Sequence, residues 1–169
     1  MHMKGQPERD FAVNLKYDGG YRFSSQASED GRFHGEPYVS DEPDPVGEAS
    51  GPATPALLGS AVTHCLSASL LEALRHARVE VLDFEAEAVA VVKPNAEGNP
   101  RIDHIDVTLR PRLAQSNPRM NRCAEVFENY CTVTSSVKRG IDVRVGVDWS
   151  IDESDEVPAE KVPSKEAQA

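Results

Sequence analysis

The sequence predicts an α+β fold with an antiparallel sheet, because runs of strand-like segments are separated by lone helical segments. Apolar residues alternate with a period of two over residues 11–17, and the same period returns at 104–110 and 141–149. Residues 54–77 instead carry apolar residues all around a helical repeat, which is typical of a buried helix. The expected order is three strands, a helix, two strands, a helix and a strand (β-β-β-α-β-β-α-β).

The first strand is predicted to present one apolar face made of Phe11, Val13, Leu15 and Tyr17. The run Asp18-Gly19-Gly20 is a turn signal, and Tyr21-Arg22-Phe23 begins a returning strand, so the two segments predict a hairpin. A third strand is expected over residues 32–39. An irregular loop rich in Pro and Gly follows over residues 41–52.

The first helix is predicted over residues 54–77. Thr54 can cap it, and Pro55 suits the first helical position. No Asp, Glu, Lys or Arg occurs between residues 49 and 71, and a membrane span needs about 20 apolar residues. The prolines, Ser, Thr and His64 within this stretch favour a buried central helix instead. One sheet face cannot cover a helix that is apolar all round, so we expect a partner subunit and a homodimer.

The second half of the chain alternates between strands and one helix. Residues 79–92 predict a strand pair or one long strand, and residues 93–100 predict a turn. The next strand places Ile105, Val107 and Leu109 on one face. A helix opens at Asn117-Pro118 and continues to Cys131, with its apolar stripe formed by Met120, Cys123, Ala124, Phe127, Tyr130 and Cys131. The last strand is expected over residues 141–149.

Length and charge give the domain organisation. The chain of 169 residues fits one domain, which we place at 10–150, after a flexible N-terminus (1–9) and before a disordered acidic tail (151–169). The net charge of −10 arises from acidic residues in 29–48 and 152–169, and no basic patch exists to bind nucleic acid. No signal peptide and no membrane span are predicted, so we expect a cytoplasmic, reducing location.

Three cysteines are too few for a secreted disulfide framework. Cys65 lies within the uncharged helix, Cys131 lies at the end of the second one, and Cys123 is read as core packing. His64 is expected to be a packed or interface side chain. The histidines and cysteines lack the spacing of a zinc site, so we expect no metal and no cofactor.

Several segments, taken in order, resemble the OsmC and Ohr superfamily, the osmotically induced and organic-hydroperoxide-resistance proteins. These segments are Asp41-Glu42-Pro43, the stretch 51–58, the helix leading to His64-Cys65, Cys131-Thr132-Val133 and Gly140-Ile141-Asp142-Val143. The resemblance covers about residues 11–149. It implies an intertwined α+β dimer in which two central helices pack against curved antiparallel sheets.

The resemblance also implies an activity, the reduction of organic hydroperoxides by a cysteine pair at a dimer interface. Cys65 would be the peroxidatic thiol and Cys131 the resolving thiol, with a small or protein dithiol as the reductant. The family peroxidases use an Arg from the N-terminal strands to hold the thiolate. Arg22 is the best candidate for that role, with Arg32 behind it.

The chain departs from the family peroxidases at the start of the first helix. Those proteins carry a Glu there, whereas Pro55-Ala56-Leu57-Leu58 contains no acid, and Thr132 follows Cys131 where many members have Pro. A buried thiol without a nearby cation is inert. The sequence therefore leaves open a non-catalytic module that holds an apolar or acyl ligand at the dimer interface, and a purely structural stress-associated dimer.

Overall fold

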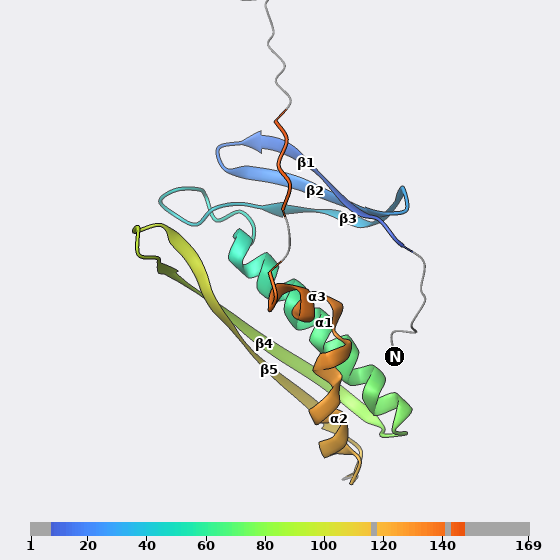
Figure 1. The fold of residues 1–169 in the computed structure, drawn as a ribbon. Coiled ribbons are helices and arrows are strands. Elements are labelled where there is room, and N and C mark those ends of the chain that lie inside the picture. The colour runs from blue at the N-terminus through green and yellow to red at the C-terminus, as the bar shows by residue number, and fades with distance from the viewer. Residues whose placement is uncertain (1–7, 116–117, 141–142, 148–169) are drawn as a thin grey trace, which may run out of the picture.

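The computed structural model describes residues 8–115, 118–140 and 143–147, and these form an α+β fold with two antiparallel sheets (Figure 1). The fold class and the order of its elements agree with the prediction, although the strands divide into two separate sheets. The elements are β1 (Phe11–Gly19), β2 (Arg22–Glu29), β3 (Arg32–Ser40), α1 (Thr54–His76), β4 (Val81–Pro94), β5 (Pro100–Leu113), α2 (Met120–Val126), the 3₁₀ helix η1 (Phe127–Tyr130) and α3 (Thr132–Val137).

The N-terminal sheet has the strand order β1-β2-β3. Its first turn contains Gly19 and Gly20 with φ of +107° and +58°, a backbone conformation that glycine adopts without steric cost. The predicted apolar face of β1 is confirmed, since Leu15 pairs with Ser25 and Tyr17 with Phe23 across the sheet. The other described residues leave that face largely exposed: its β1 members Phe11, Val13, Leu15 and Tyr17 are 70%, 51%, 60% and 62% exposed.

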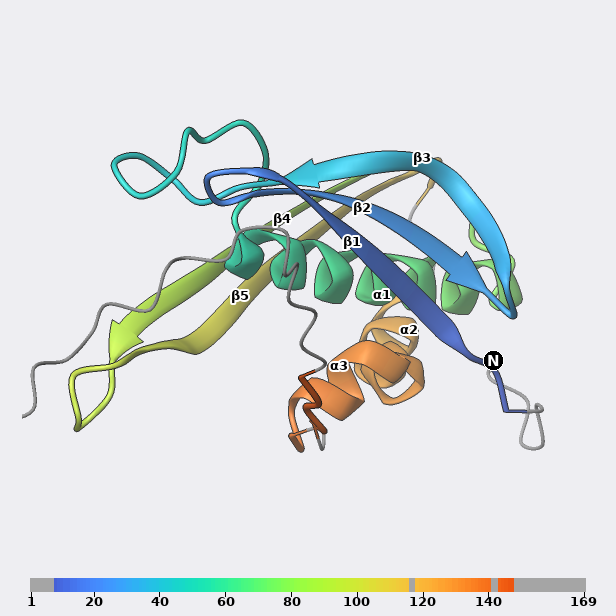
Figure 2. The ribbon, with the colours of Figure 1, turned by 90° about the horizontal axis from the view of Figure 1, so that it is seen from above.

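The second sheet is a long hairpin of β4 and β5 that runs alongside α1, whereas the N-terminal sheet lies as a separate layer on another side of the helix (Figures 1 and 2). The segment predicted over 79–92 is thus one long strand rather than a strand pair, although it begins at Val81 and not at residue 79. The turn at Asn95 is shorter than predicted, because the strands continue to Pro94 and resume at Pro100. Asn95 shapes it by accepting hydrogen bonds from the amides of Glu97 (3.1 Å) and Asn99 (2.9 Å).

Helix α1 begins at the predicted Thr54 and ends at His76, one residue before the predicted end, and Ala53 rather than Thr54 stands at the N-cap position. Its fully buried face consists of Gly59, Val62, Leu66, Leu70 and Leu74. By length and composition α1 could cross a membrane, a test that the core helix of a soluble protein also passes. Cys65 lies beside this buried face and not at its centre, so its side chain is only partly buried within the single chain.

The second predicted helix is broken into α2, η1 and α3, and the prediction of one helix ending at Cys131 is wrong. Cys131 has an extended backbone (φ −80°, ψ 106°) and stands at the N-cap of α3, where its sulfur accepts a hydrogen bond from the Thr134 amide. A side chain that bonds to a nearby amide favours a helix start over a helix interior. Residue 117, where the prediction began, lies outside the described residues.

The last predicted strand is not formed within residues 143–147, where Val143, Val145 and Val147 are 77%, 82% and 65% exposed. Positions 141–142 and 148–149 of that strand lie outside the described residues. So do the tail over 151–169 and residues 1–7 of the expected flexible N-terminus.

The core consists of two neighbouring clusters between α1, β5 and the α2–α3 segment. Leu70, Leu74, Val79 and Cys123 form the first cluster, in which Cys123 is a packing residue as predicted. Val62, Leu66 and Cys131 form the second, and Cys65 packs at its edge. Leu109 and Phe127 contact both clusters and join them. The second cluster therefore fixes where the two cysteines meet.

Candidate functional site

The fold brings Cys65 and Cys131 together from distant parts of the chain. Cys65 projects from the middle of α1 and packs against the core cluster that contains Cys131, close enough for Cys131 to influence the pKa of the Cys65 thiol. Cys131 is 0% exposed, whereas Cys65 is partly exposed, and both are free thiols. A reagent that enters from outside therefore meets Cys65 first.

Thr134 holds Cys131 in place through both its backbone and its side chain. The Cys131 thiol donates to Thr134 Oγ1 at 3.0 Å, and the Thr134 amide donates to Cys131 Sγ at 3.4 Å. Thr134 is itself buried. The sequence offered only one signal for this contact, a Thr three residues after a Cys that caps a helix.

The surroundings of Cys65 disfavour its thiolate within the single chain. Burial raises the pKa of the Cys65 thiol, and the hydrogen bond with Cys131 raises it further. The amides of Val133 and Thr134, at the start of α3, oppose this by donating toward the Cys65 sulfur. None of these contacting groups among the described residues is a cation, so these groups do not supply the charge that activates a cysteine.

A cavity of about 390 Å³ opens beside Cys65, between α1 and the α2–η1 segment. Its lining residues are Cys65, Ala68, Ser69, Glu72, Ala73, His76, Arg122, Cys123, Val126 and Tyr130. A second, wider groove of about 810 Å³ lies on another face of α1, against β4, and includes His64. Within the described residues, no group of three or more His, Cys, Asp or Glu side chains is placed to hold a metal ion.

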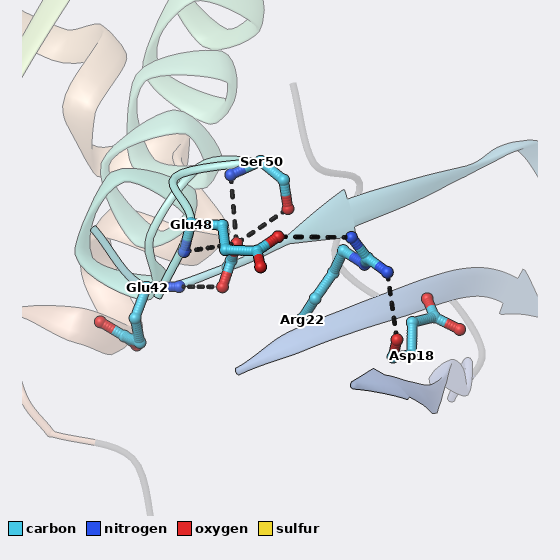
Figure 3. A network of polar contacts seen from close by, with 6 residues as sticks. Asp18, Arg22, Glu42, Glu48 and Ser50 are labelled. Carbon is cyan, nitrogen blue, oxygen red and sulfur yellow. Dashed lines mark hydrogen bonds and ion pairs between the residues drawn. The ribbon is translucent and has the colours of Figure 1, made fainter. Parts of the chain in front are cut away.

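Arg22 does not line the cavity beside Cys65 in the single chain. It lies near the start of β2 and faces the loop over residues 41–50 (Figure 3). Its guanidinium donates to the carbonyl oxygen of Asp18 at 3.1 Å, and its Nη1 lies 3.8 Å from Glu48 Oε2. Arg32, the second candidate, is an exposed residue of β3 paired across the sheet with Glu29.

The loop that carries Glu48 is organised around the carboxylate of Asp41, which accepts hydrogen bonds from Glu42, Glu48 and Ser50. Asp41 is only 5% exposed, and it accepts hydrogen bonds from the amides of Glu42 (2.8 Å), Glu48 (3.2 Å) and Ser50 (3.1 Å) and from the Ser50 hydroxyl (2.8 Å). Gly47 is required because a Cβ there would collide with the Glu42 carbonyl. The sequence flagged Asp41 as family-like without assigning it this anchoring role.

Replacing Asp41 with Asn is expected to lower the melting temperature at pH 7, since an amide nitrogen cannot accept these bonds. The Ser50 hydroxyl, followed by the backbone amides, holds the pKa of Asp41 below its usual value. The stability that it contributes is therefore present above its unfolded pKa of about 4 and is lost as the pH falls through the lower folded pKa.

Thermal unfolding followed by circular dichroism between pH 7 and pH 2.5 tests this prediction. The gap between wild type and Asp41→Asn should close at the acid end. Asp44→Asn, on an exposed part of the same loop, is the matched control and should track wild type. A gap that stays constant with pH would show that the loop does not depend on the ionised carboxylate.

A family model for OsmC-like proteins matches residues 47–146, which is more than half of the chain. Among solved structures, an OsmC-like protein of unknown function from Vibrio cholerae aligns with a TM-score of 0.59 at 15% identity, covering 77% of this chain and 93% of that one. An OsmC-like protein from Mycoplasma pneumoniae gives 0.59 at 15% identity, covering 79% and 89%.

An organic hydroperoxide resistance protein OsmC from Legionella pneumophila gives a TM-score of 0.55 at 12% identity, covering 76% of this chain and 89% of that one. No curated protein matches the sequence. At these identities the structural matches establish a shared fold, and the family model adds the sequence pattern. Because the family model covers more than half of its residues, the chain belongs to the OsmC-like protein family.

Proposed function

We propose that this protein is a thiol-dependent peroxidase that reduces organic hydroperoxides through Cys65 and Cys131. The observation that carries the proposal is the pairing of one accessible thiol with one fully buried thiol, drawn from segments far apart in the chain. Membership in the OsmC-like family supports a role in defence against oxidative stress.

In the proposed cycle the Cys65 thiolate attacks one oxygen of the peroxide, and the O–O bond breaks. The alkoxide takes a proton and leaves as an alcohol, while Cys65 becomes a sulfenic acid. Cys131 then attacks the Cys65 sulfur as a thiolate, water leaves, and a disulfide forms. An external dithiol restores both thiols by exchange. Because Cys131 is buried and Cys65 is partly exposed, the peroxide reacts with Cys65 first, and Cys131 acts in the second step.

The proposal includes a homodimer, because the single chain leaves two features incomplete. The apolar face of β1 is uncovered, and the N-terminal strands pack chiefly on one another. Cys65 also lacks a cationic contact among the described residues. A second copy would cover the sheet and could bring Arg22 of its own β2 to Cys65, which would lower the pKa of the thiol.

Arg22→Gln is expected to reduce kcat/KM for cumene hydroperoxide about a hundredfold and to shift its pH profile toward higher pH. The loss follows from removing the charge that favours the thiolate. Arg22→Lys keeps a charge but not the guanidinium fork, so it should recover part of the rate. In this proposal Glu48 orients Arg22, in place of the acid missing at Ala56, and Glu48→Gln should show a weaker form of the same shift.

The control for this series is Arg101→Gln, which removes an exposed charge on β5, outside the residues that line the Cys65 cavity. Its pH profile should match wild type. If Arg22→Gln has the wild-type rate and profile, another group activates Cys65, and the assignment of Arg22 fails while the cysteine pair stands.

The experiment that tests the function itself is a thiol count after one equivalent of cumene hydroperoxide, with peptide mapping of any disulfide. A rapid Cys65–Cys131 bridge that a dithiol reverses is the expected result, with Cys123 left free. If all three thiols stay free, the protein is not a peroxidase of this kind.

The second candidate is a non-catalytic module that holds an apolar or acyl ligand. It is favoured by the raised pKa of the Cys65 thiol and by the absence of an acid near Ala56. It is disfavoured by the closeness of Cys65 and Cys131, since a binding module has no need to bring two thiols together. Native mass spectrometry of the purified protein would reveal a retained ligand, which the peroxidase proposal does not require.

A further inference from the structure

The cavity beside Cys65 is elongated along one face of α1. Its α1 residues fall at positions i, i+3, i+4, i+7, i+8 and i+11, so they form a single stripe on the helix. They are Cys65, Ala68, Ser69, Glu72, Ala73 and His76. At 1.5 Å per residue, the stripe extends about 16 Å from Cys65 to His76. The reactive thiol therefore stands at one end of the cavity, and His76 stands at the other.

The middle of the cavity is apolar. Ala68 and Ala73 line it from α1, while Cys123, Val126 and Tyr130 line it from the opposite α2–η1 wall. Small side chains on the helix leave the space open, and the apolar wall favours an alkyl chain over water. The length corresponds to about a dozen carbon atoms of an extended chain.

The end far from Cys65 is lined by one acidic, one basic and one imidazole side chain, those of Glu72, Arg122 and His76. Glu72 is already engaged by His76 at 3.0 Å and by Arg75 at 3.4 Å. Arg122 places Nη1 3.0 Å from Glu125, and a guanidinium has five N–H donors, so Arg122 can bind a second carboxylate.

From this arrangement we propose that Arg122 is a specificity residue that binds the carboxylate of a hydroperoxy carboxylic acid. The alkyl chain of this substrate lies along α1, and its hydroperoxide group reaches Cys65. The part of this inference that concerns hydroperoxide reduction rests on the proposed function, whereas the binding of a carboxylate rests on the cavity alone. An anion suits the site because a carboxylate accepts two parallel hydrogen bonds from a guanidinium. His76 lies on the facing wall, where its Nε2 is 3.0 Å from Glu72 Oε1.

Protection of Cys65 from alkylation tests the site without any peroxidase activity. Dodecanoate should slow iodoacetamide labelling of Cys65, read by peptide mapping, at concentrations about tenfold below those at which 1-dodecanol does. Arg122→Gln should erase this difference between acid and alcohol, and Arg101→Gln should preserve it. Equal protection by the two compounds in wild type would overturn the carboxylate site.

Turnover provides the second arm, with 12-hydroperoxydodecanoic acid, its methyl ester and cumene hydroperoxide as substrates. The acid should have a KM about tenfold below that of the ester at similar kcat. Arg122→Gln should raise the KM for the acid alone. A variant that slows all three substrates equally would assign Arg122 a structural role and reject the proposal.

The two arms separate the failure of this inference from failure of the proposed function. If no hydroperoxide is turned over but dodecanoate still protects Cys65 better than 1-dodecanol, the peroxidase proposal fails and the carboxylate site stands. If cumene hydroperoxide is reduced while the acid and the ester behave alike, the peroxidase proposal stands and the carboxylate site fails.

Discussion

Cys65→Ser is expected to abolish reduction of organic hydroperoxides, with a loss of about a thousandfold or more in kcat/KM. A serine hydroxyl has nearly the size of the thiol, so the packing around α1 is kept. It is not ionised at neutral pH, however, and cannot form a sulfenic acid or a disulfide with Cys131. Peroxide consumption in the presence of a dithiol measures the effect.

Cys131→Ser and Cys123→Ser are the controls for the Cys65→Ser experiment. Cys131→Ser should consume one equivalent of peroxide and stop, with a sulfenic acid on Cys65 that dimedone traps. Cys123→Ser should still form the Cys65–Cys131 disulfide after peroxide is added, because the Cys123 thiol bonds to the Ala73 carbonyl (3.5 Å), two helical turns beyond Cys65 on α1. Activity in Cys65→Ser would transfer the peroxidatic role to another residue.

Leu15→Asp should convert a dimer into a monomer and remove most of the peroxidase activity with it. Leu15 is 60% exposed in the centre of the apolar face of β1, where a second copy would bury it. Placing an unpaired carboxylate in such an interface costs several kcal/mol, enough to dissociate a dimer at micromolar concentration. Sedimentation equilibrium and the cumene hydroperoxide assay, at one protein concentration, report both effects.

Asn14→Asp is the matched control, because it creates the same side chain on the opposite face of the same strand. Asn14 is exposed, and its neighbours on that face include Ala12 and Lys16. This variant should remain a dimer with wild-type activity. A wild-type protein that sediments as a monomer would remove the dimer from the proposal, and with it the route by which Arg22 could reach Cys65.

Strands β1 to β5 and helix α1 were predictable from local patterns, whereas the strand predicted over 141–149 is not formed within residues 143–147. The alternation in β5 and the uncharged run in α1 agree with burial, while the alternation in β1 predicts the strand although its apolar face is exposed. The break at Cys131 was not predictable, since helical spacing continues from Met120 through the interruption. What decides it is a contact of a sulfur with the Thr134 amide, which periodicity does not encode.

Of the candidate site, the resemblance named two cysteines that pack in one core cluster, but the sequence did not reveal the groups around them. Cys65 and Cys131 were paired by resemblance to a family, because nothing in their spacing along the chain indicates contact. The ion pair of Arg22 with Glu48 depends on a loop folded around Asp41, and loop geometry of this kind is set by tertiary hydrogen bonds. The end of the cavity far from Cys65 is lined by Arg122 of α2 and His76 of α1, two helices that are far apart in the sequence.

The position of Cys131 at the N-cap of α3 has a consequence for how the protein would report its own oxidation. The Cys131 sulfur accepts the Thr134 amide and thereby satisfies one of the free backbone donors at the helix start. A sulfur bonded to Cys65 would carry no proton for Thr134 Oγ1 and would be a different acceptor for that amide. Oxidation of Cys131 would therefore also change the backbone hydrogen bonding at the start of α3. The rate of amide hydrogen exchange in the first turn of α3 measures that change.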